Sequence, residues 1–453
     1  MENGEVSHTY TSRIPILPVK FEHSHNVMVA EAFSYLRMTL DTQNTFLKYF
    51  DDGMTPSVAR AYHEMFIESQ YEGPDLYVHL SNAQVIPTER QVNYLYEKWR
   101  TANFGTREEK SILDVLRQKE ESLSQAGLKL ILKENPLIII VLTPIMLRAH
   151  RRDYSHDIVF IDSSGSCDQT NISITFLFAA SKIGAVPLAC ILHTEQSEAN
   201  YTLAFSLLRE KLGNEGFGGF GFPNVIMTDD SLAERNSLRT VFPESHLLLC
   251  IFHVLQAFWR WLWSSNHGIS KDHRKIIMTQ FQRLLYSVCK ENAEEIYNET
   301  LSNEIYLLYD NLIKYVKGMW ECKRDWILCF RNQLLTKGHN TNNFAEASIR
   351  IFKDIVLQRC RAFNACALVD FFVTVFESYH RKHLLTYANN RKNKYINNQM
   401  LQQSKNISTC EYPPMNLGEN LANIFIRYGE NNLLFRVSIC FDNDFINNIV
   451  GYK

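Results

Sequence analysis

Three acidic residues in this 453-residue sequence have the types and positions that suit binding of divalent cations. Asp162 ends the apolar run HDIVFID, Asp229 ends the later run NVIMTD, and Glu346 begins a segment with helical character. Three carboxylates in one cleft can hold two divalent cations roughly 3.5–4 Å apart, and such a pair promotes in-line displacement at a phosphodiester. Because carboxylate oxygens are hard ligands, we expect Mg²⁺ or Mn²⁺, with two ions in the site.

Each of these acids also has an ordinary structural explanation when it is taken singly. Asp162 could end a strand before the polar segment SSGSCDQTN, and Asp229 could begin a turn. Glu346 could complete a capping box if Asn343 is the N-cap, or it could pair with Arg350 one helical turn later. Spacing alone therefore leaves both the three-acid site and the structural explanation open.

A series of short apolar segments predicts the elements that would bring the acids together. Strands are predicted at 156–162, 172–181 and 185–194, a helix at 199–212, a strand at 224–229, a helix from the capping box Ser231–Glu234, and a strand at 246–252. If the first and fourth strands are neighbours, Asp162 and Asp229 meet at one edge. After the strand at 246–252, apolar and polar residues no longer alternate as they do in strands. A helix is then predicted at 341–356, where the apolar side chains fall on one stripe.

These patterns divide the chain into four zones. Residues 155–375 are predicted to form an α/β domain with a helical insertion at 254–340, and the Asn-rich segment 376–453 is a peripheral tail. Residues 1–22 are an irregular lead-in, and 23–150 form a mostly helical region without bound metal. Thr55-Pro56 starts one helix there and 89–100 forms another. A helical bundle is favoured, and a DNA-binding helix-turn-helix remains the alternative.

Composition narrows the class of protein. The 47 basic and 49 acidic residues leave a formal charge of −2, which weighs mildly against nucleic-acid binding, although such footprints are local. Ten cysteines contain no Cys-x-x-Cys pair, which favours a reducing compartment. The longest apolar run, 136–147, is too short to span a bilayer, and the first residues do not resemble a signal peptide. We therefore expect a soluble intracellular protein without a membrane partner.

Three weaker patterns each have a plain alternative. Cys250-x-x-His253 has half the spacing of a zinc site, but no second pair lies nearby, so a strand-to-helix junction is the favoured interpretation. The glycine-rich loop 216–221 lacks the Gly-Lys-Ser/Thr of a phosphate-binding loop and is interpreted as a flexible connection. Trp259 and Trp263 share one helical face, which usually means core packing, although a tryptophan there could stack on an unpaired DNA base.

Three segments of the sequence resemble the core of the Mutator-like (MULE) transposases, and together they cover about 155–375. The segments are IVFIDSSGSCDQTN, PNVIMTDDSLAERNSLRTVFPESHLLLCIFHVLQAFWRW and HNTNNFAEASIRIFK. They contain the family pattern T-D-x-x-x-A, then F-P-x-x-x-x-x-L-C-x-x-H, then T-N-N-x-x-E. The matching residues are Thr228, Asp229, Ala233, Phe242, Pro243, Leu249, Cys250, His253, Thr341, Asn342, Asn343 and Glu346.

This resemblance implies a ribonuclease-H-like mixed sheet with a helical insertion before the last catalytic helix. It implies a DNA transposase of the Asp-Asp-Glu (DDE) type, in which Asp162, Asp229 and Glu346 hold the metal ions. The substrates would be the terminal inverted repeats of a mobile element and target DNA, bound by a homo-oligomer in the nucleus. Auxiliary or DNA-contacting roles are implied for residues beside these acids. The candidates are Cys250, His253, Asn343 and Trp259.

Two departures from the family keep a second class of function open. No cysteine precedes Cys167, so an N-terminal zinc module is missing, and the tail has only Cys410 and Cys440 where many members carry a SWIM zinc finger. Plant transcription factors of the far-red-response type are retired transposases of this family. The chain could therefore be a truncated copy, or a domesticated DNA-binding, transcription-regulating protein without strand-transfer activity. A ribonuclease-H-type nuclease would fit the fold but not the long insertion.

Overall fold

The computed structural model describes residue 26, residues 29–389 and two strands at 421–428 and 433–440. These residues divide into two compact units, with the boundary between Asn103 and Phe104. The lead-in expected at 1–22 lies outside the described residues. Throughout the described part of the chain, every helix is too short or too polar to cross a membrane.

The first unit is helical, as expected. Its helices are α1 (Ala30–Ser34), α2 (Leu40–Asp51), α3 (Pro56–Glu68), α4 (Gly73–Ser81) and the larger part of α5 (Glu89–Phe104). Proline occupies the first position of α3, where its missing N–H breaks no helical hydrogen bond, and this confirms the predicted start. Phe46, Phe50, Ala59 and Val92 form the buried core between α2, α3 and α5, so these helices pack as a small bundle.

The helical region expected at 23–150 is interrupted by a β-hairpin that belongs to the second unit. After α6 (Glu109–Gln125) come β1 (Lys129–Lys133) and β2 (Ile138–Leu142), followed by α7 (Pro144–His150) and α8 (Tyr154–Asp157). All five side chains of β2 are buried. A strand covered on both faces has a continuous apolar sequence without alternation, so periodicity cannot separate it from a buried helix.

A seven-stranded mixed sheet forms the centre of the second unit, and its strand and helix order confirms the prediction. The further strands are β3 (Ile158–Ser164), β4 (Ser173–Ser181), β5 (Gly184–His193), β6 (Val225–Thr228) and β7 (His246–Leu249), with α9 (Glu198–Leu212) and α10 (Leu232–Val241) between them. The spatial order is β1-β2-β5-β4-β3-β6-β7. β3, β4 and β5 pair antiparallel, whereas β6 is parallel to both β3 and β7.

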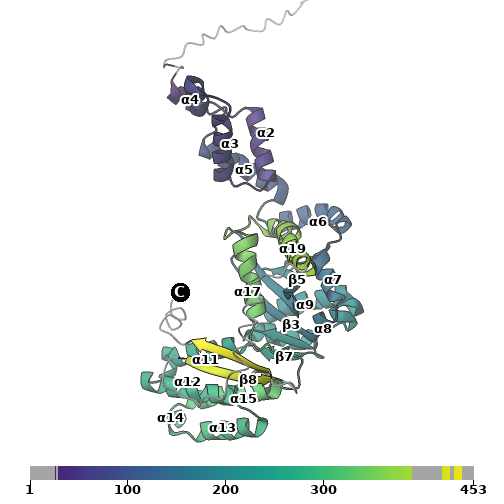
Figure 1. Cartoon of the computed structure of the whole chain (residues 1–453), viewed down its shortest axis with the longest axis vertical. Coiled ribbons are helices and arrows are strands. Elements are labelled where there is room, and N and C mark those ends of the chain that lie inside the picture. The colour runs from purple at the N-terminus through teal and green to yellow at the C-terminus, as the bar shows by residue number, and fades with distance from the viewer. Residues whose placement is uncertain (1–25, 27–28, 390–420, 429–432, 441–453) are drawn as a thin grey trace, which may run out of the picture. The chain divides into compact units, whose positions relative to one another are not determined.

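Helices cover both faces of this sheet (Figure 1). Side chains such as Phe160 and Phe176 pack against α6, α17 (Asn343–Ile351) and the segments after it, whereas Ile161 and Leu177 pack against α7, α9 and α10. The segments after α17 are η5 (Phe352–Val356), α18 (Ala365–Phe371), η6 (Phe372–Phe376) and α19 (Glu377–Ala388). The tail expected at 376–453 thus begins with a helix, and its strands β8 (Leu421–Tyr428) and β9 (Leu433–Cys440) form a hairpin; the rest lies outside the described residues.

The insertion expected at 254–340 is helical and, in that fully described range, contains no strand. Its helices are α11 (Ile251–Trp263), α12 (Lys271–Leu285), α13 (Lys290–Ser302), α14 (Glu304–Leu307), α15 (Asp310–Glu321) and α16 (Lys323–Trp326). They have a core of their own, in which Trp326 stacks on Phe281 with ring centroids 4.8 Å apart. The Trp326 indole N–H also donates a hydrogen bond to the Met319 carbonyl at 2.8 Å.

We expect Trp326→Ala to destabilise the insertion by about 3–5 kcal/mol, because it removes a fully buried ring and leaves a cavity. Trp263, which is 45% exposed, is the matched control. Trp263→Ala should cost much less in urea unfolding followed by circular dichroism. Equal losses for the two variants would contradict the assignment of Trp326 to the core.

Candidate active site

Asp162 and Asp229 lie on neighbouring parallel strands. Phe160 of β3 pairs with Met227 of β6, and continuing that register by two residues places Asp162 beside Asp229. The sequence predicts that Asp162 ends its strand. In the structure β3 continues beyond it and pairs with β4 as far as Ser164. It lies instead where the pairing with β6 stops, and this leaves its side chain at the open edge of the β3–β6 pair.

Strand alternation directs both aspartates to the face that α17 covers. Phe160 and Met227, each two residues earlier, belong to the core cluster under α17, and side chains two apart on a strand share a face. Glu346 lies in the first turn of α17 and is 39% exposed. The structure therefore brings the three predicted acids to one side of the sheet, and they come from β3, the end of β6 and α17.

Asn342 connects these elements by hydrogen bonds, whereas the motif of the sequence favours its neighbour Asn343 as the auxiliary residue. Asn342 is fully buried, and its Nδ2 donates hydrogen bonds to the carbonyl of Ile161 at 2.9 Å and to Oδ1 of Asp229 at 3.3 Å. It is also the N-cap of α17, although its side chain makes no capping hydrogen bond. Asn343 is the first helical residue and is exposed, so the condition for a capping box between Asn343 and Glu346 is not met.

His253 and Cys250 lie next to the acids. His253 Nδ1 is 2.6 Å from Oδ1 of Asp229, and its Nε2 is 3.6 Å from Oε1 of Glu346. Cys250 is buried at the junction of β7 and α11, where its Sγ accepts a hydrogen bond from the Asn342 backbone N–H at 3.2 Å. Glu346 therefore contacts His253, whereas the ion pair of Arg350 is to Asp354.

The grouped charges shift the pKa values of these side chains. Burial, together with the negative charges of Asp229 and Glu234, raises the pKa of Asp162 to about 8. Burial also raises the pKa of Glu346, with Asp229 adding to the effect and His253 opposing it. Burial lowers the pKa of His253, but Asp229 and Cys250 beside it outweigh that effect and raise it to about 11. A site with excess negative charge suits a cation.

We expect Asp162→Asn to stabilise the metal-free protein by an amount that grows with pH. The folded pKa of about 8 lies above the usual 3.8, so ionising Asp162 costs folding free energy as the pH rises through this window. The gain over the unmutated protein should be below about 1 kcal/mol at about pH 4 and on the order of 5 kcal/mol at about pH 8, because one pKa unit corresponds to about 1.4 kcal/mol. Thermal unfolding in EDTA across this range measures it, and a gain that is constant or falls with pH would contradict it.

Glu234 is a buried acid beneath the site that the sequence analysis assigned to a capping box. Its carboxylate instead accepts hydrogen bonds from the hydroxyl of Thr228, the residue before Asp229, and from Ser163 Oγ at 3.2 Å, the residue after Asp162. Ser231 makes no side-chain cap. Burial raises the pKa of Glu234 to about 7. Glu234 thus joins α10 to the ends of the two strands that carry the aspartates.

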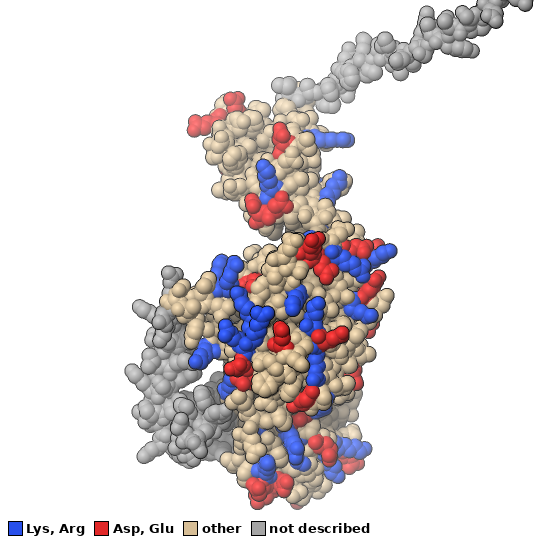
Figure 2. All heavy atoms as spheres, turned by 90° about the vertical axis from the view of Figure 1, so that its right-hand side faces the viewer, with Lys and Arg blue, Asp and Glu red and all other residues tan. Residues whose placement is uncertain are grey.

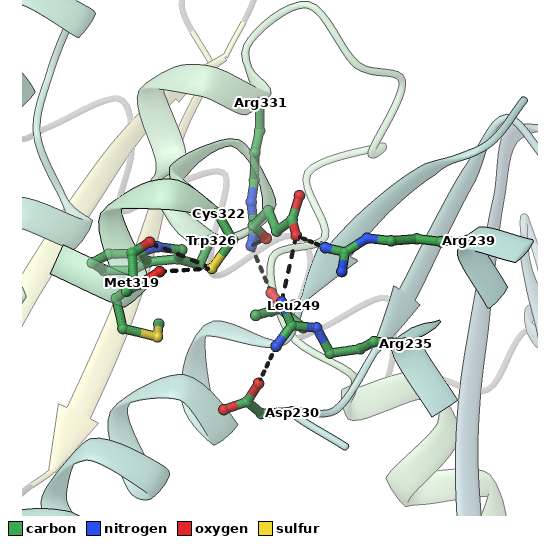
Figure 3. Close-up of polar contacts among 10 residues, drawn as sticks. Asp230, Arg235, Arg239, Leu249, Met319, Cys322, Trp326 and Arg331 are labelled. Carbon is green, nitrogen blue, oxygen red and sulfur yellow. Dashed lines mark hydrogen bonds and ion pairs between the residues drawn. The ribbon is translucent and has the colours of Figure 1, made fainter. Parts of the chain in front are cut away.

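Asp230 takes part in a separate ionic network (Figure 3). Its Oδ1 lies 2.6 Å from Nη1 of Arg235, and Arg235 also lies 3.5 Å from Asp325 of α16, which Arg239 contacts too. Nearby, Arg331 donates a hydrogen bond to the Leu249 carbonyl at 2.6 Å. The network attaches the helical insertion to α10 and β7. Asp229 and Asp230 are adjacent in the chain but therefore contact different groups, His253 and Arg235 respectively.

Trp259 and the glycine-rich loop lie in packed surroundings. Trp259 packs against the core of the insertion, and its ring contacts Trp263 with centroids 5.8 Å apart. In the loop, Phe217 is fully buried and its backbone N–H donates a hydrogen bond to His150 Nδ1 at 3.3 Å. This loop was interpreted as a flexible connection, but an apolar anchor between its glycines holds it against the sheet.

The three acids are of the residue type that suits Mg²⁺ or Mn²⁺, although the donor atoms found within 4.8 Å of one another among the described residues belong to Asp229, Cys250 and His253. Asp162, Asp229 and Glu346 offer carboxylate oxygens on one side of the sheet, which are the ligands these cations prefer. Burial, and after it the neighbouring acids, raise the pKa of Asp162, and a bound cation would relieve both effects.

Comparison with known proteins places part of this arrangement in a family. Residues 170–257 match the model of the MULE transposase domain. The matched segment runs from before β4 into α11 and contains Asp229, Cys250 and His253, but neither Asp162 nor Glu346. A search of curated proteins returned no match. Residues 170–257 are therefore similar to the MULE transposase domain, the family that the motifs of the sequence resemble.

Proposed function

We propose that this chain is a metal-dependent DNA transposase of the three-acid type, with Asp162, Asp229 and Glu346 as its metal ligands. The observation that carries the proposal is the convergence of these acids, from β3, β6 and α17, on one face of the sheet. A transposase domain implies interaction with DNA. The order β5-β4-β3-β6-β7, with three antiparallel strands followed by two parallel ones, supports a ribonuclease-H-like core.

When bound, two Mg²⁺ or Mn²⁺ ions would activate the attacking oxygen and stabilise the leaving oxygen of a phosphodiester. The residues of the chain provide the charge and its placement. Asp162 and Asp229 project from adjacent strands whose ends Glu234 holds together, and Asn342 orients the carboxylate of Asp229. Preorganised ligands need little rearrangement during reaction, which is the main source of such electrostatic catalysis.

The proposed partners are the terminal inverted repeats of a mobile element and target DNA. The chain is almost neutral, but Lys and Arg side chains gather with some Asp and Glu on the face of the second unit drawn in Figure 2. Such local groups can neutralise backbone phosphates despite a balanced total charge. Because an element has two ends, we propose a homo-oligomer on the DNA, and the nucleus as its location.

The test is cleavage and joining of a duplex that bears the inverted repeats flanking the gene, with Mg²⁺ or Mn²⁺ and the full chain. Cleavage that is lost in both Asp162→Asn and Glu346→Gln, each folded by circular dichroism, would support the proposal. Unmutated protein that binds this duplex but cuts it with neither metal would favour the domesticated DNA-binding protein instead. Cleavage that survives either substitution would exclude the three-acid assignment.

A further inference from the structure

We propose that Asp229, Cys250 and His253 together bind one thiophilic divalent cation, of which Zn²⁺ is the type example. A carboxylate oxygen, the thiol sulfur and a ring nitrogen from these residues all lie within 4.8 Å of one another. Carboxylate, thiolate and imidazole are the three side-chain donors that Zn²⁺ takes in proteins. The Cys-x-x-His spacing alone supplied two ligands; the third comes from the end of β6, which is paired with the strand that precedes Cys250.

Surrounding groups lie behind all three ligands, and two of the ligands accept hydrogen bonds from them, as in built metal sites. The second ring nitrogen of His253 faces Oε1 of Glu346 at 3.6 Å, which is too long for a hydrogen bond but places a carboxylate behind the imidazole. Asn342 serves the other two ligands. Its side-chain N–H donates to Asp229 at 3.3 Å, and its backbone N–H donates to the sulfur of Cys250 at 3.2 Å.

The ring nitrogen of His253 that faces Asp229 is also placed to share a cation with that carboxylate. His253 Nδ1 is buried and makes no well-formed hydrogen bond, although Asp229 Oδ1 is 2.6 Å away. Two donor atoms that face each other in poor hydrogen-bond geometry are suited to share a cation. On binding, the Cys250 thiol and the protonated His253 ring would each release a proton to solvent as the metal–sulfur and metal–nitrogen bonds form. The carboxylate, the thiolate and a neutral imidazole would then balance the charge of one divalent ion.

This site goes beyond the proposed transposase activity, and it does not require that the chain cut DNA. It shares Asp229 with the three-acid site but uses neither Asp162 nor Glu346 as a ligand. When Asp229 binds the ion that Cys250 also binds, its carboxylate is no longer available to the two Mg²⁺ ions. We therefore expect Zn²⁺ to inhibit any Mg²⁺-dependent cleavage, with the two kinds of ion competing for Asp229.

The test is a titration of the metal-free, reduced full-length protein with Co²⁺, followed by absorption spectroscopy without DNA. We expect one equivalent to produce a sulfur-to-cobalt charge-transfer band in the near ultraviolet and the visible bands of tetrahedral cobalt, and Zn²⁺ to bleach both. Cys250→Ser should abolish the sulfur band and weaken Co²⁺ binding by at least about 100-fold, more than loss of a supporting group does. No sulfur band at one equivalent would overturn the proposal.

Two control variants separate this site from other thiols and from the three-acid site. Cys329→Ser removes another buried thiol and should leave the spectrum unchanged. Asp162→Asn should keep the sulfur band, whereas it should lose the stabilisation by Mg²⁺ that the proposed function requires. A band that persists in Cys250→Ser, or that disappears in Asp162→Asn, would overturn the thiophilic site. If Cys250→Ser does not fold, His253→Gln must weaken Co²⁺ binding, and unchanged binding would count against the proposal.

Discussion

Replacing Asp229 by Asn should lower the rate of DNA cleavage on the order of 10²-fold or more, while replacing the adjacent Asp230 by Asn should change it little. The amide keeps the shape of Asp229 but removes the charge that would hold a cation against the phosphodiester. Asp230 has the same charge and is one residue away, but its carboxylate lies 2.6 Å from Arg235 on the other side. Cleavage of a duplex bearing the element's ends, per folded protein, measures the difference.

The expected cost of Asp230→Asn is in stability. Removing one partner of a half-buried ion pair that retains Asp325 as a second acid should cost about 1 kcal/mol in urea unfolding. Wild-type cleavage by Asp229→Asn would exclude Asp229 as a metal ligand. An equal loss in the two variants would mean that the strand end as a whole, and not one carboxylate, governs activity.

Asn342→Ala should reduce cleavage on the order of 10- to 100-fold and raise the Mg²⁺ concentration needed for half-maximal rate. The substitution removes the only side-chain amide that, within the described residues, bonds both the Ile161 carbonyl and the Asp229 carboxylate. Asp229 would keep its charge but lose the group that orients it. Metal-dependence curves measure this effect, because a purely structural loss would lower the maximal rate without moving the half-maximal Mg²⁺ concentration.

Asn343 is the control for that experiment. It is exposed at the first position of α17, so Asn343→Ala should change the rate by less than about twofold. If Asn343→Ala instead moved the metal dependence and Asn342→Ala did not, the orienting role would belong to Asn343, as the sequence motif had suggested. Both amides lie in the same T-N-N motif, so a comparison of their effects separates orientation of Asp229 from a general requirement for the motif.

The Asp229 and Asn342 variants separate two properties of the site, the negative charge of a ligand and its orientation. Asp229 tests whether charge at the end of β6 matters, and Asn342 tests whether its orientation does. A domesticated DNA-binding protein would show neither effect on DNA binding, since its affinity would rest on phosphate contacts elsewhere. The same variants can therefore be scored for binding and for cleavage on one duplex.

The sequence by itself determined the order of elements around the site, because each strand and helix there has a local pattern. The runs that ended at Asp162 and Asp229 are strands β3 and β6, the stripe beginning at Ala345 is α17, and the loss of alternation after β7 is the helical insertion. The combined motifs also predicted the MULE match, which no single motif could have done. Local periodicity is sufficient for such conclusions because it depends on residues within a few positions of one another.

Tertiary structure alone decided which polar side chains turn inward. Glu234 has the spacing of a capping box, but its carboxylate instead accepts a hydrogen bond from the hydroxyl of Ser163, which is 71 residues away in the sequence. Asn342 and Asn343 have the same local pattern, and the difference between them is the Ile161 carbonyl, 181 residues away in sequence. The continuous apolar run of β2 became a strand because β1 and β5 flank it. In each case the deciding partner comes from a distant element, and a buried polar group or backbone must be satisfied by whichever partner the fold brings to it.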